Sequence, residues 1–191
     1  MEATAMQDLA RRRATYADLV AAPPNLVAEI IDGELITHPR PASRQAYAAS
    51  VLGGFLNQRF QSGNGGPGGW WIVDEPELHL ADDVAVPDIG GWRRDRMPKY
   101  IDAAYFSLAP DWLCEFLSPS TAGFDRGQKA SIYARHGVQH LWLVDQIARK
   151  LEAYKLRDGD WALQKTWRDD EDVAAAPFTG VPIRLGMLWP E

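Results

Sequence analysis

Cysteine and long apolar runs are scarce in this chain. Among its 191 residues Cys114 is the one cysteine, so no disulfide can form within the chain. No apolar run approaches the roughly 20 residues that cross a membrane, and residues 1–9 lack the apolar centre of a secretion signal. We therefore expect a cytoplasmic protein with no membrane partner.

The sequence also lacks the patterns of several hydrolase classes. His136 and His140 have the His-x-x-x-His spacing, but the predicted helix ends at His136 and Gly137 follows it, so the pair does not lie on one helix face and argues little for a zinc hydrolase. No serine lies in a Gly-x-Ser-x-Gly pattern. The glycine-rich residues 61–69 lack the Lys-Ser or Lys-Thr ending of a phosphate-binding loop. A net charge of −6 argues against a general nucleic-acid coat, because such binding depends on neutralising many phosphates. An enzyme with a local basic patch is still compatible with this charge.

The chain does contain enough apolar residues for one core. With 46% hydrophobic residues over 191 positions, it is long enough for one well-packed domain and too short for two. We predict a flexible tail over residues 1–14 and a single domain over residues 15–191.

Strand and helix patterns alternate through this domain. Asp32-Gly33 separates two β-rich runs, as in a tight hairpin. Apolar residues recur at helical spacing over residues 43–60 and 124–136. Further β-rich runs predict strands at residues 84–92, 112–117 and 140–145. The predicted fold class is α/β (α+β), with a mixed central β-sheet flanked by helices.

Three residues in the middle of the chain suggest a metal site. Asp88 and Glu115 each lie inside an apolar, β-rich run, where a carboxylate is costly unless it binds a cation or is well paired. Lys129 falls on the apolar stripe of the predicted helix that follows. A hard cation such as Mg²⁺ takes oxygen ligands from one or two carboxylates and completes its shell with water and substrate phosphate.

Several short motifs occur along the chain in a fixed order. They are Glu29-Ile30-Ile31-Asp32-Gly33-Glu34-Leu35, Val86-Pro87-Asp88, Glu115-Phe116-Leu117-Ser118-Pro119-Ser120-Thr121, Asp125-Arg126 with Lys129 and Tyr133, Gly137-Val138, and Leu141-Trp142-Leu143-Val144-Asp145. In this order they resemble the Uma-two family of restriction-endonuclease-like proteins, which is assigned to the PD-(D/E)XK nuclease superfamily. The resemblance covers about residues 15–165.

This resemblance implies a restriction-endonuclease-like fold and a Mg²⁺- or Mn²⁺-dependent endonuclease that acts on DNA. Asp88 and Glu115 would be metal ligands, the backbone carbonyl of Phe116 would add a third, and Lys129 would be the catalytic lysine. The chain departs from the pattern at two positions. Leu117 replaces the lysine of the Glu-x-Lys motif, so the lysine must come from the next helix, and Gln45 stands where many relatives carry a histidine.

Other residues are candidates for supporting roles. Glu34, rather than Glu29, is expected to join the acidic group as an auxiliary residue. Four basic residues after Asp88 are candidates for contacts with DNA phosphates, namely Arg93, Arg94, Arg96 and Lys99. The symmetry of duplex DNA suggests a homodimer. Two alternatives stay open at this point: a catalytically silent nucleic-acid- or protein-binding domain, and a hydrolase of smaller phosphate esters.

Overall fold

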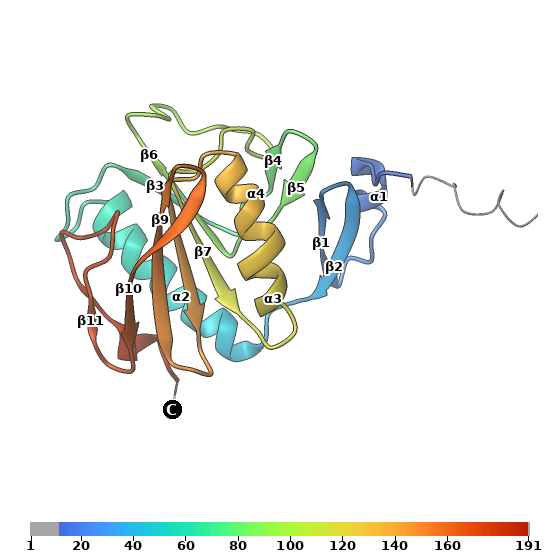
Figure 1. The fold of residues 1–191 in the computed structure, drawn as a ribbon. Coiled ribbons are helices and arrows are strands. Elements are labelled where there is room, and N and C mark those ends of the chain that lie inside the picture. Colours follow the sequence, from blue (N-terminus) through green and yellow to red (C-terminus); the bar gives the residue numbers. More distant parts are fainter. Residues whose placement is uncertain (1–11, 191) are drawn as a thin grey trace, which may run out of the picture.

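A six-stranded sheet forms the centre of the molecule (Figure 1). The computed structural model describes residues 12–190 of the 191. The strand order is β10-β9-β8-β7-β6-β3, with β7 and β8 parallel and the other neighbours antiparallel, so the sheet is mixed as predicted. Its strands are β3 (Trp70–Asp74), β6 (Ile89–Arg93), β7 (Trp112–Leu117), β8 (His140–Asp145), β9 (Lys150–Arg157) and β10 (Asp160–Arg168).

A second, four-stranded sheet has the order β2-β1-β5-β4. Its strands are β1 (Leu26–Ile31), β2 (Glu34–Pro39), β4 (Leu78–Leu80) and β5 (Asp83–Ala85). Asp32 and Gly33, with φ of 53° and 85°, form the predicted hairpin turn between β1 and β2. A small pair, β11 (Asp172–Val173) and β12 (Ile183–Arg184), precedes the short helix η3 (Leu185–Leu188).

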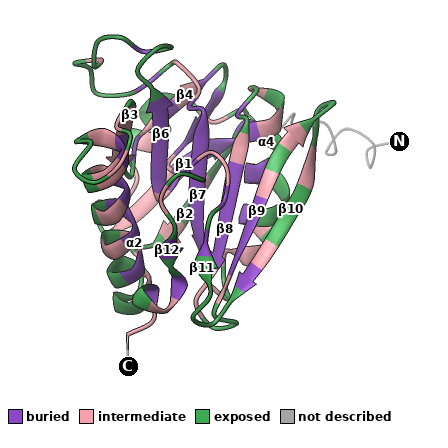
Figure 2. Ribbon diagram, turned by 90° about the vertical axis from the view of Figure 1, so that its left-hand side faces the viewer, coloured by how far each residue is buried: buried purple, intermediate pink, exposed green. Residues whose placement is uncertain are grey.

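Helices pack on both faces of the central sheet. On one face lies α2 (Ser43–Leu56), which continues as the π-helix η1 (Asn57–Gln61). The other face carries a helical stretch made of α3 (Ala122–Phe124), the π-helical η2 (Asp125–Lys129) and α4 (Ala130–Arg135). Figure 1 shows α2 and α4 on opposite sides of β7, and Figure 2 shows that β6, β7 and β8 are the most deeply buried strands.

The alternation of β7 places Glu115 on the α4 face of the sheet. Trp112, Cys114 and Phe116 pack in one core cluster, together with residues of α2. Leu113 and Leu117 pack in the other cluster, together with residues of α4. Since successive side chains of a strand point to opposite faces, Glu115 points to the same side as Leu113 and Leu117.

The expected single strand over residues 84–92 is wrong. The structure divides it into β5, which pairs with β1 and β4, and β6, which pairs with β3 and β7. Pro87 lies in the break, where its missing N–H group cannot contribute to a ladder. The break places Asp88 between the two sheets.

The last residues of the predicted tail, residues 12–14, are attached to the domain. Residues 1–11 of that tail lie outside the described residues, but the backbone N–H of Ala14 donates to the Gly33 carbonyl at 2.8 Å. The helix α1 (Tyr16–Val20) follows, capped by the Thr15 side chain. Within residues 12–190, no helix has the length and apolar character needed to cross a membrane.

Candidate active site

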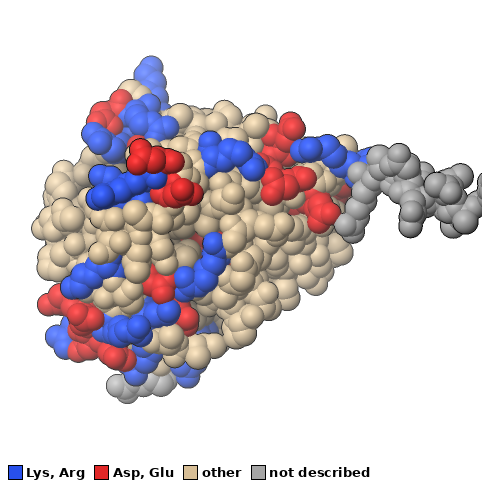
Figure 3. Space-filling view, in the orientation of Figure 1, with Lys and Arg blue, Asp and Glu red and all other residues tan. Residues whose placement is uncertain are grey.

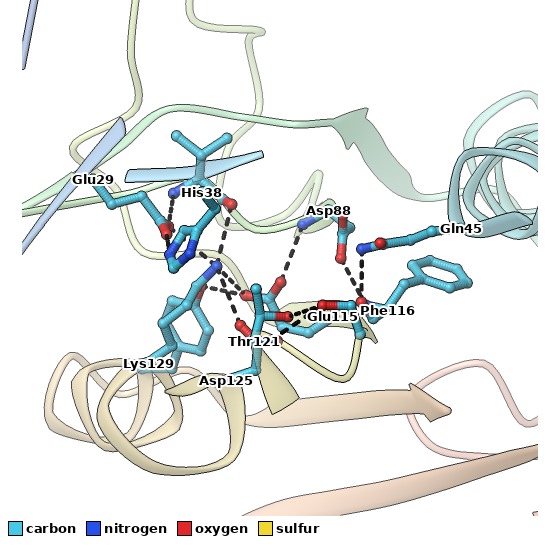
Figure 4. A network of polar contacts seen from close by, with 12 residues as sticks. Glu29, His38, Gln45, Asp88, Glu115, Phe116, Thr121, Asp125 and Lys129 are labelled. Carbon is cyan, nitrogen blue, oxygen red and sulfur yellow. Dashed lines mark hydrogen bonds and ion pairs between the residues drawn. The ribbon is translucent and has the colours of Figure 1, made fainter. Parts of the chain in front are cut away.

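A cleft of about 300 Å³ lies where the two sheets and the η2 helix meet. Glu29 on β1, Asp88 before β6, Glu115 on β7 and Lys129 on η2 all line it. The three residues predicted to form the site are therefore brought together despite their separation in sequence. Figure 4 shows their side chains pointing toward one another from these different elements.

Lys129 is the centre of the buried charges. Its side chain is only 5% exposed, and Nζ lies 3.0 Å from Glu115 Oε1, 3.1 Å from Glu29 Oε1 and 3.9 Å from Asp125 Oδ1. Burial alone would lower the pKa of the Lys129 ammonium, but Glu115 and Glu29 outweigh burial and raise the pKa well above its ordinary value. The lysine is therefore charged, and its head group is held inside the protein.

The ammonium does not compensate its acidic neighbours equally. Burial favours a raised pKa for Glu29, but Lys129, His38 and the Val86 N–H together lower it below its ordinary value. For Glu115, burial is dominant and raises the pKa well above its ordinary value despite Lys129. One ammonium cannot balance several carboxylates in a low-dielectric site. Of these two acids, Glu115 is therefore the one whose ionised form is less well compensated.

Glu115 is held on one side and open toward Asp88 on the other. The hydroxyl of Tyr133 donates to Glu115 Oε1 at 2.6 Å, the same oxygen that faces Lys129. The second oxygen, Oε2, accepts a long contact of 3.4 Å from the backbone N–H of Asp88. Two donors thus fix Oε1, while Oε2 is directed to the Asp88 side of the cleft.

Asp88 is oriented by the neighbouring strand. Its Oδ2 accepts the backbone N–H of Phe116 at 2.6 Å, and no hydrogen bond to Oδ1 is made by any described residue. Burial raises the pKa of Asp88 to about 6, although the Phe116 hydrogen bond and Lys129 act in the opposite direction. A bound cation would favour the ionised form of this carboxylate.

Gln45 supports the Phe116 carbonyl. Its side-chain amide on α2 donates to Phe116 O at 2.7 Å. Gln45 stands at the position where the family resemblance implies a histidine. The structure shows that α2 does reach the cleft, and that Gln45 fixes the direction of a candidate ligand (Figure 4).

Glu29, and not Glu34, is the acid that the hairpin brings to the cleft. Glu34 is exposed at the start of β2 and lies beside Arg12 and Arg13, in a different surface hollow. Glu29 is only 1% exposed and accepts the Val86 N–H at 2.7 Å. Glu34, which was expected to join the acidic group, is therefore not among the residues that line the cleft, and Glu29 takes that place.

His38 is a further cleft residue that sequence reasoning missed. Its buried Nε2 lies 3.4 Å from Glu29 Oε2, yet the two atoms are not aligned as a hydrogen bond, and this nitrogen has no hydrogen-bond partner among the described residues. Its ring packs 5.1 Å from the Phe124 ring. No local pattern distinguishes His38, since its place depends on the pairing of β2 with β1.

The predicted DNA-contacting residues lie away from the cleft. Arg93 pairs with Asp95, and Arg96 pairs with Asp111 at 2.7 Å. Arg94 lies 4.0 Å above the Trp71 ring and donates to two backbone carbonyls. Lys99 is exposed. Asp88 and Arg93 stand at opposite ends of β6, about 17 Å apart for a strand of this length. On the face drawn in Figure 3, Lys and Arg are mixed with Asp and Glu.

The donor atoms of the cleft suit a hard divalent cation. Asp88 Oδ1, Glu115 Oε2 and the second lone pair of Phe116 O are oxygen donors, which Mg²⁺ and Mn²⁺ prefer. The described residues contain no cluster of three or more His, Cys, Asp or Glu side chains arranged to hold a metal. The residues thus fit an open site with two carboxylates, completed by water and substrate, and not a closed structural site.

The mixed sheet flanked by helices, with the cleft at the break before β6, defines a restriction-endonuclease-like fold. A solved structure with this architecture, described as a putative nuclease belonging to DUF820 from Anabaena variabilis, matches with a TM-score of 0.73 over 92% of this chain and 97% of that one. At 22% sequence identity, this likeness concerns the fold alone.

The chain belongs to the Uma2 family, described as putative restriction endonucleases, whose model matches residues 13–185. A relative from Synechocystis, the uncharacterized protein sll1609, is 32% identical over 106 residues. That match spans 54% of this chain and 55% of the relative, so this chain covers about half of that protein. The family resemblance read from the ordered motifs is confirmed.

Proposed function

We propose that the protein is a Mg²⁺- or Mn²⁺-dependent endonuclease that hydrolyses phosphodiester bonds of DNA. The observation that carries this proposal is the convergence of Asp88, Glu115 and Lys129, with the Phe116 carbonyl, in one cleft. Burying two poorly compensated carboxylates beside one lysine is costly, and a bound cation offsets that cost. Membership of a family of putative restriction endonucleases supports the same activity.

The roles of the residues follow from their contacts. Asp88, Glu115 and the Phe116 carbonyl would hold the cation, which supplies a water of lowered pKa and stabilises charge on the phosphate oxygens. Tyr133 and Lys129 fix Glu115 Oε1, which leaves Oε2 for the ligand position. Gln45 and the Phe116 N–H orient the other two donors. Lys129 adds a positive charge beside the reacting phosphate without a reorganisation cost.

A cleavage assay tests this proposal. Supercoiled plasmid, linear duplex and single-stranded DNA, with a small phosphodiester as a fourth substrate, would be incubated with Mg²⁺, Mn²⁺, Ca²⁺ or EDTA. We expect cleavage of DNA with Mg²⁺ or Mn²⁺ and none with EDTA, and Glu115→Gln should remove it. Cleavage of the small ester alone would instead favour a phosphate-ester hydrolase. Metal-independent cleavage, or full activity of Glu115→Gln, would refute the proposed site.

One observation favours a second candidate, a catalytically silent binding domain. The charge of Lys129 is balanced by Glu29 and Glu115 within the protein, as in a purely structural network. Titration with Mn²⁺ separates the two functions. An enzyme should bind Mn²⁺ at a site that Asp88→Ala removes, whereas a silent module should bind none. The proposed homodimer is tested separately by measuring the mass in solution with and without DNA.

A further inference from the structure

Three side chains of the cleft wall can carry a positive charge, and one of them, Arg40, is not held by a buried carboxylate. Lys129 is held between Glu29 and Glu115, and His38 Nε2 faces the Glu29 carboxylate. Arg40 also lines the cleft, and its side chain is 57% exposed. An anionic substrate that enters the cleft therefore meets Arg40 as its accessible cation.

Among the described residues Arg40 has one weak ionic partner, Glu75, which also lies on the cleft wall. Its Nη1 lies 3.7 Å from Glu75 Oε2, outside hydrogen-bond distance, and the Glu75 side chain is 48% exposed. An exposed ion pair of this kind contributes little to stability. A phosphate can therefore replace the carboxylate at Arg40 at small cost, and with the two-point hydrogen bonding that a guanidinium offers.

The backbone around Arg40 is restricted before any ligand binds. Arg40 is flanked by Pro39, the last residue of β2, and by Pro41, which lies between β2 and α2. Proline fixes its own φ, and the residue before a proline is confined to extended conformations. Little backbone entropy is then lost when Arg40 is ordered on a ligand.

We propose that Arg40 is the residue that binds a substrate phosphate at the cleft, and that Glu75 occupies Arg40 until the phosphate replaces it. This inference rests on the proposed function for the nature of the substrate. It assigns phosphate binding to the segment after β2 and not to Arg93, Arg94 and Arg96, whose guanidinium groups already contact Asp95, Trp71 and Asp111.

Four variants test this inference: two should weaken binding, one should strengthen it, and one control should leave it unchanged. Binding of labelled single-stranded and duplex oligonucleotides would be followed by fluorescence anisotropy, in Ca²⁺ and in EDTA, over a range of salt concentrations. Arg40→Gln should weaken binding about tenfold, because a charge-assisted contact is lost. It should also reduce the slope of log affinity against log salt by about 0.7–0.9, as expected for one phosphate contact. Glu75→Gln should strengthen binding, because it frees Arg40.

Arg93→Gln is the matched control, since it removes the same kind of charge from the far end of β6. Its affinity and salt slope should stay within about twofold of the wild type, because Arg93 makes no phosphate contact in this account. Arg40→Lys, which keeps the charge but not the fork of donors, should fall between the wild type and Arg40→Gln. Melting curves would establish that all variants are folded.

The outcomes are distinct from those of the cleavage assay. If the wild type binds oligonucleotides but cleaves none with Mg²⁺ or Mn²⁺, the proposed enzyme fails, and Arg40→Gln still decides this inference. Wild-type affinity and salt slope in Arg40→Gln would overturn it. So would weaker binding by Glu75→Gln, or no oligonucleotide binding by the wild type at any tested salt concentration.

Discussion

The two ends of β6 differ both in the sign of their charges and in how far the protein compensates them. At its start, Asp88 borders the cleft, and burial raises the pKa of its carboxyl to about 6. At its end, Arg93 pairs with Asp95, and Arg96, three residues further on, pairs with Asp111. The acidic end is thus short of positive charge, whereas these two arginines at the basic end are already paired with acids.

This difference shows which charges point to a ligand. A cluster whose charges cancel within the protein needs no partner, however conspicuous it is in the sequence. Buried acids that share one ammonium are stabilised by a cation from outside. We therefore expect large functional effects of substitutions at the Asp88 end and small ones at the Arg93 end.

Glu115→Gln should have the largest effect. Removing one of two carboxylates from the candidate metal site is expected to lower DNA cleavage by at least about 100-fold, a loss typical of groups that stabilise transition-state charge. The side chain keeps its size and can still accept from Tyr133, so the fold should persist. Initial rates on plasmid DNA with Mn²⁺ would measure the loss. A loss of less than tenfold would remove Glu115 from the mechanism.

Lys129→Met should reduce the free energy of unfolding by about 3–5 kcal/mol, because it leaves Glu29 and Glu115 buried without their cation. A surface pair between Lys129 and Asp125 alone would make this cost small, but the Lys129 side chain is 5% exposed and contacts two further acids. Urea denaturation measures the change. Lys99→Met, at an exposed position, is the control and should change stability by less than about 0.5 kcal/mol.

The pH dependence of stability should report on Asp88. Its folded pKa of about 6 lies above the ordinary value of 3.8, so its contribution is fully present below pH 3.8 and is lost as the pH rises through 6. Without metal, the wild type should lose about 3 kcal/mol relative to Asp88→Asn between these limits. Denaturation in EDTA at pH 4, 5, 6 and 7 measures this difference. If the free energy of unfolding changed equally with pH in both proteins, the pKa of Asp88 would not be raised in the folded state.

The basic end of β6 should give the smallest effect. Arg96→Gln is expected to cost about 1 kcal/mol of stability, because Arg96 pairs with the largely buried Asp111 but is itself 41% exposed. DNA cleavage and Mn²⁺ binding should not change. A cleavage defect larger than about threefold in a folded Arg96→Gln protein would show that Arg96 does take part in DNA binding or cleavage.

The sequence predicted those parts of the site that local patterns encode. Glu115 was found because a carboxylate inside an apolar strand is unusual. The same criterion applies to Glu29 in Leu26–Ile31, and applying it consistently would have selected Glu29 over Glu34. Most strands of the central sheet and the helix that carries Lys129 also follow from periodicity, whereas the mixed sheet was implied by the family resemblance. Pro87 was a signal for the break between β5 and β6, because a proline disfavours a central strand.

Long-range pairing limited the rest of the prediction. Arg96 and Asp111 are 15 positions apart, and nothing local shows that they pair. The positions of His38 and Arg40 on the cleft wall depend on how the β1–β2 hairpin meets the central sheet. The burial of Lys129 likewise depends on acids from two other strands. These features are properties of the assembled fold.

The central claim is that Asp88 and Glu115 hold a divalent cation, and a crystal soaked in Mn²⁺ tests it most directly. Anomalous scattering would locate the metal, and an Asp88→Ala crystal soaked in the same way would be the control. The account predicts a peak about 2.0–2.3 Å from a carboxylate oxygen of each acid, near the Phe116 carbonyl, and no such peak in Asp88→Ala. A cleft without Mn²⁺ at concentrations that support cleavage, or a peak bound by other residues, would contradict the account.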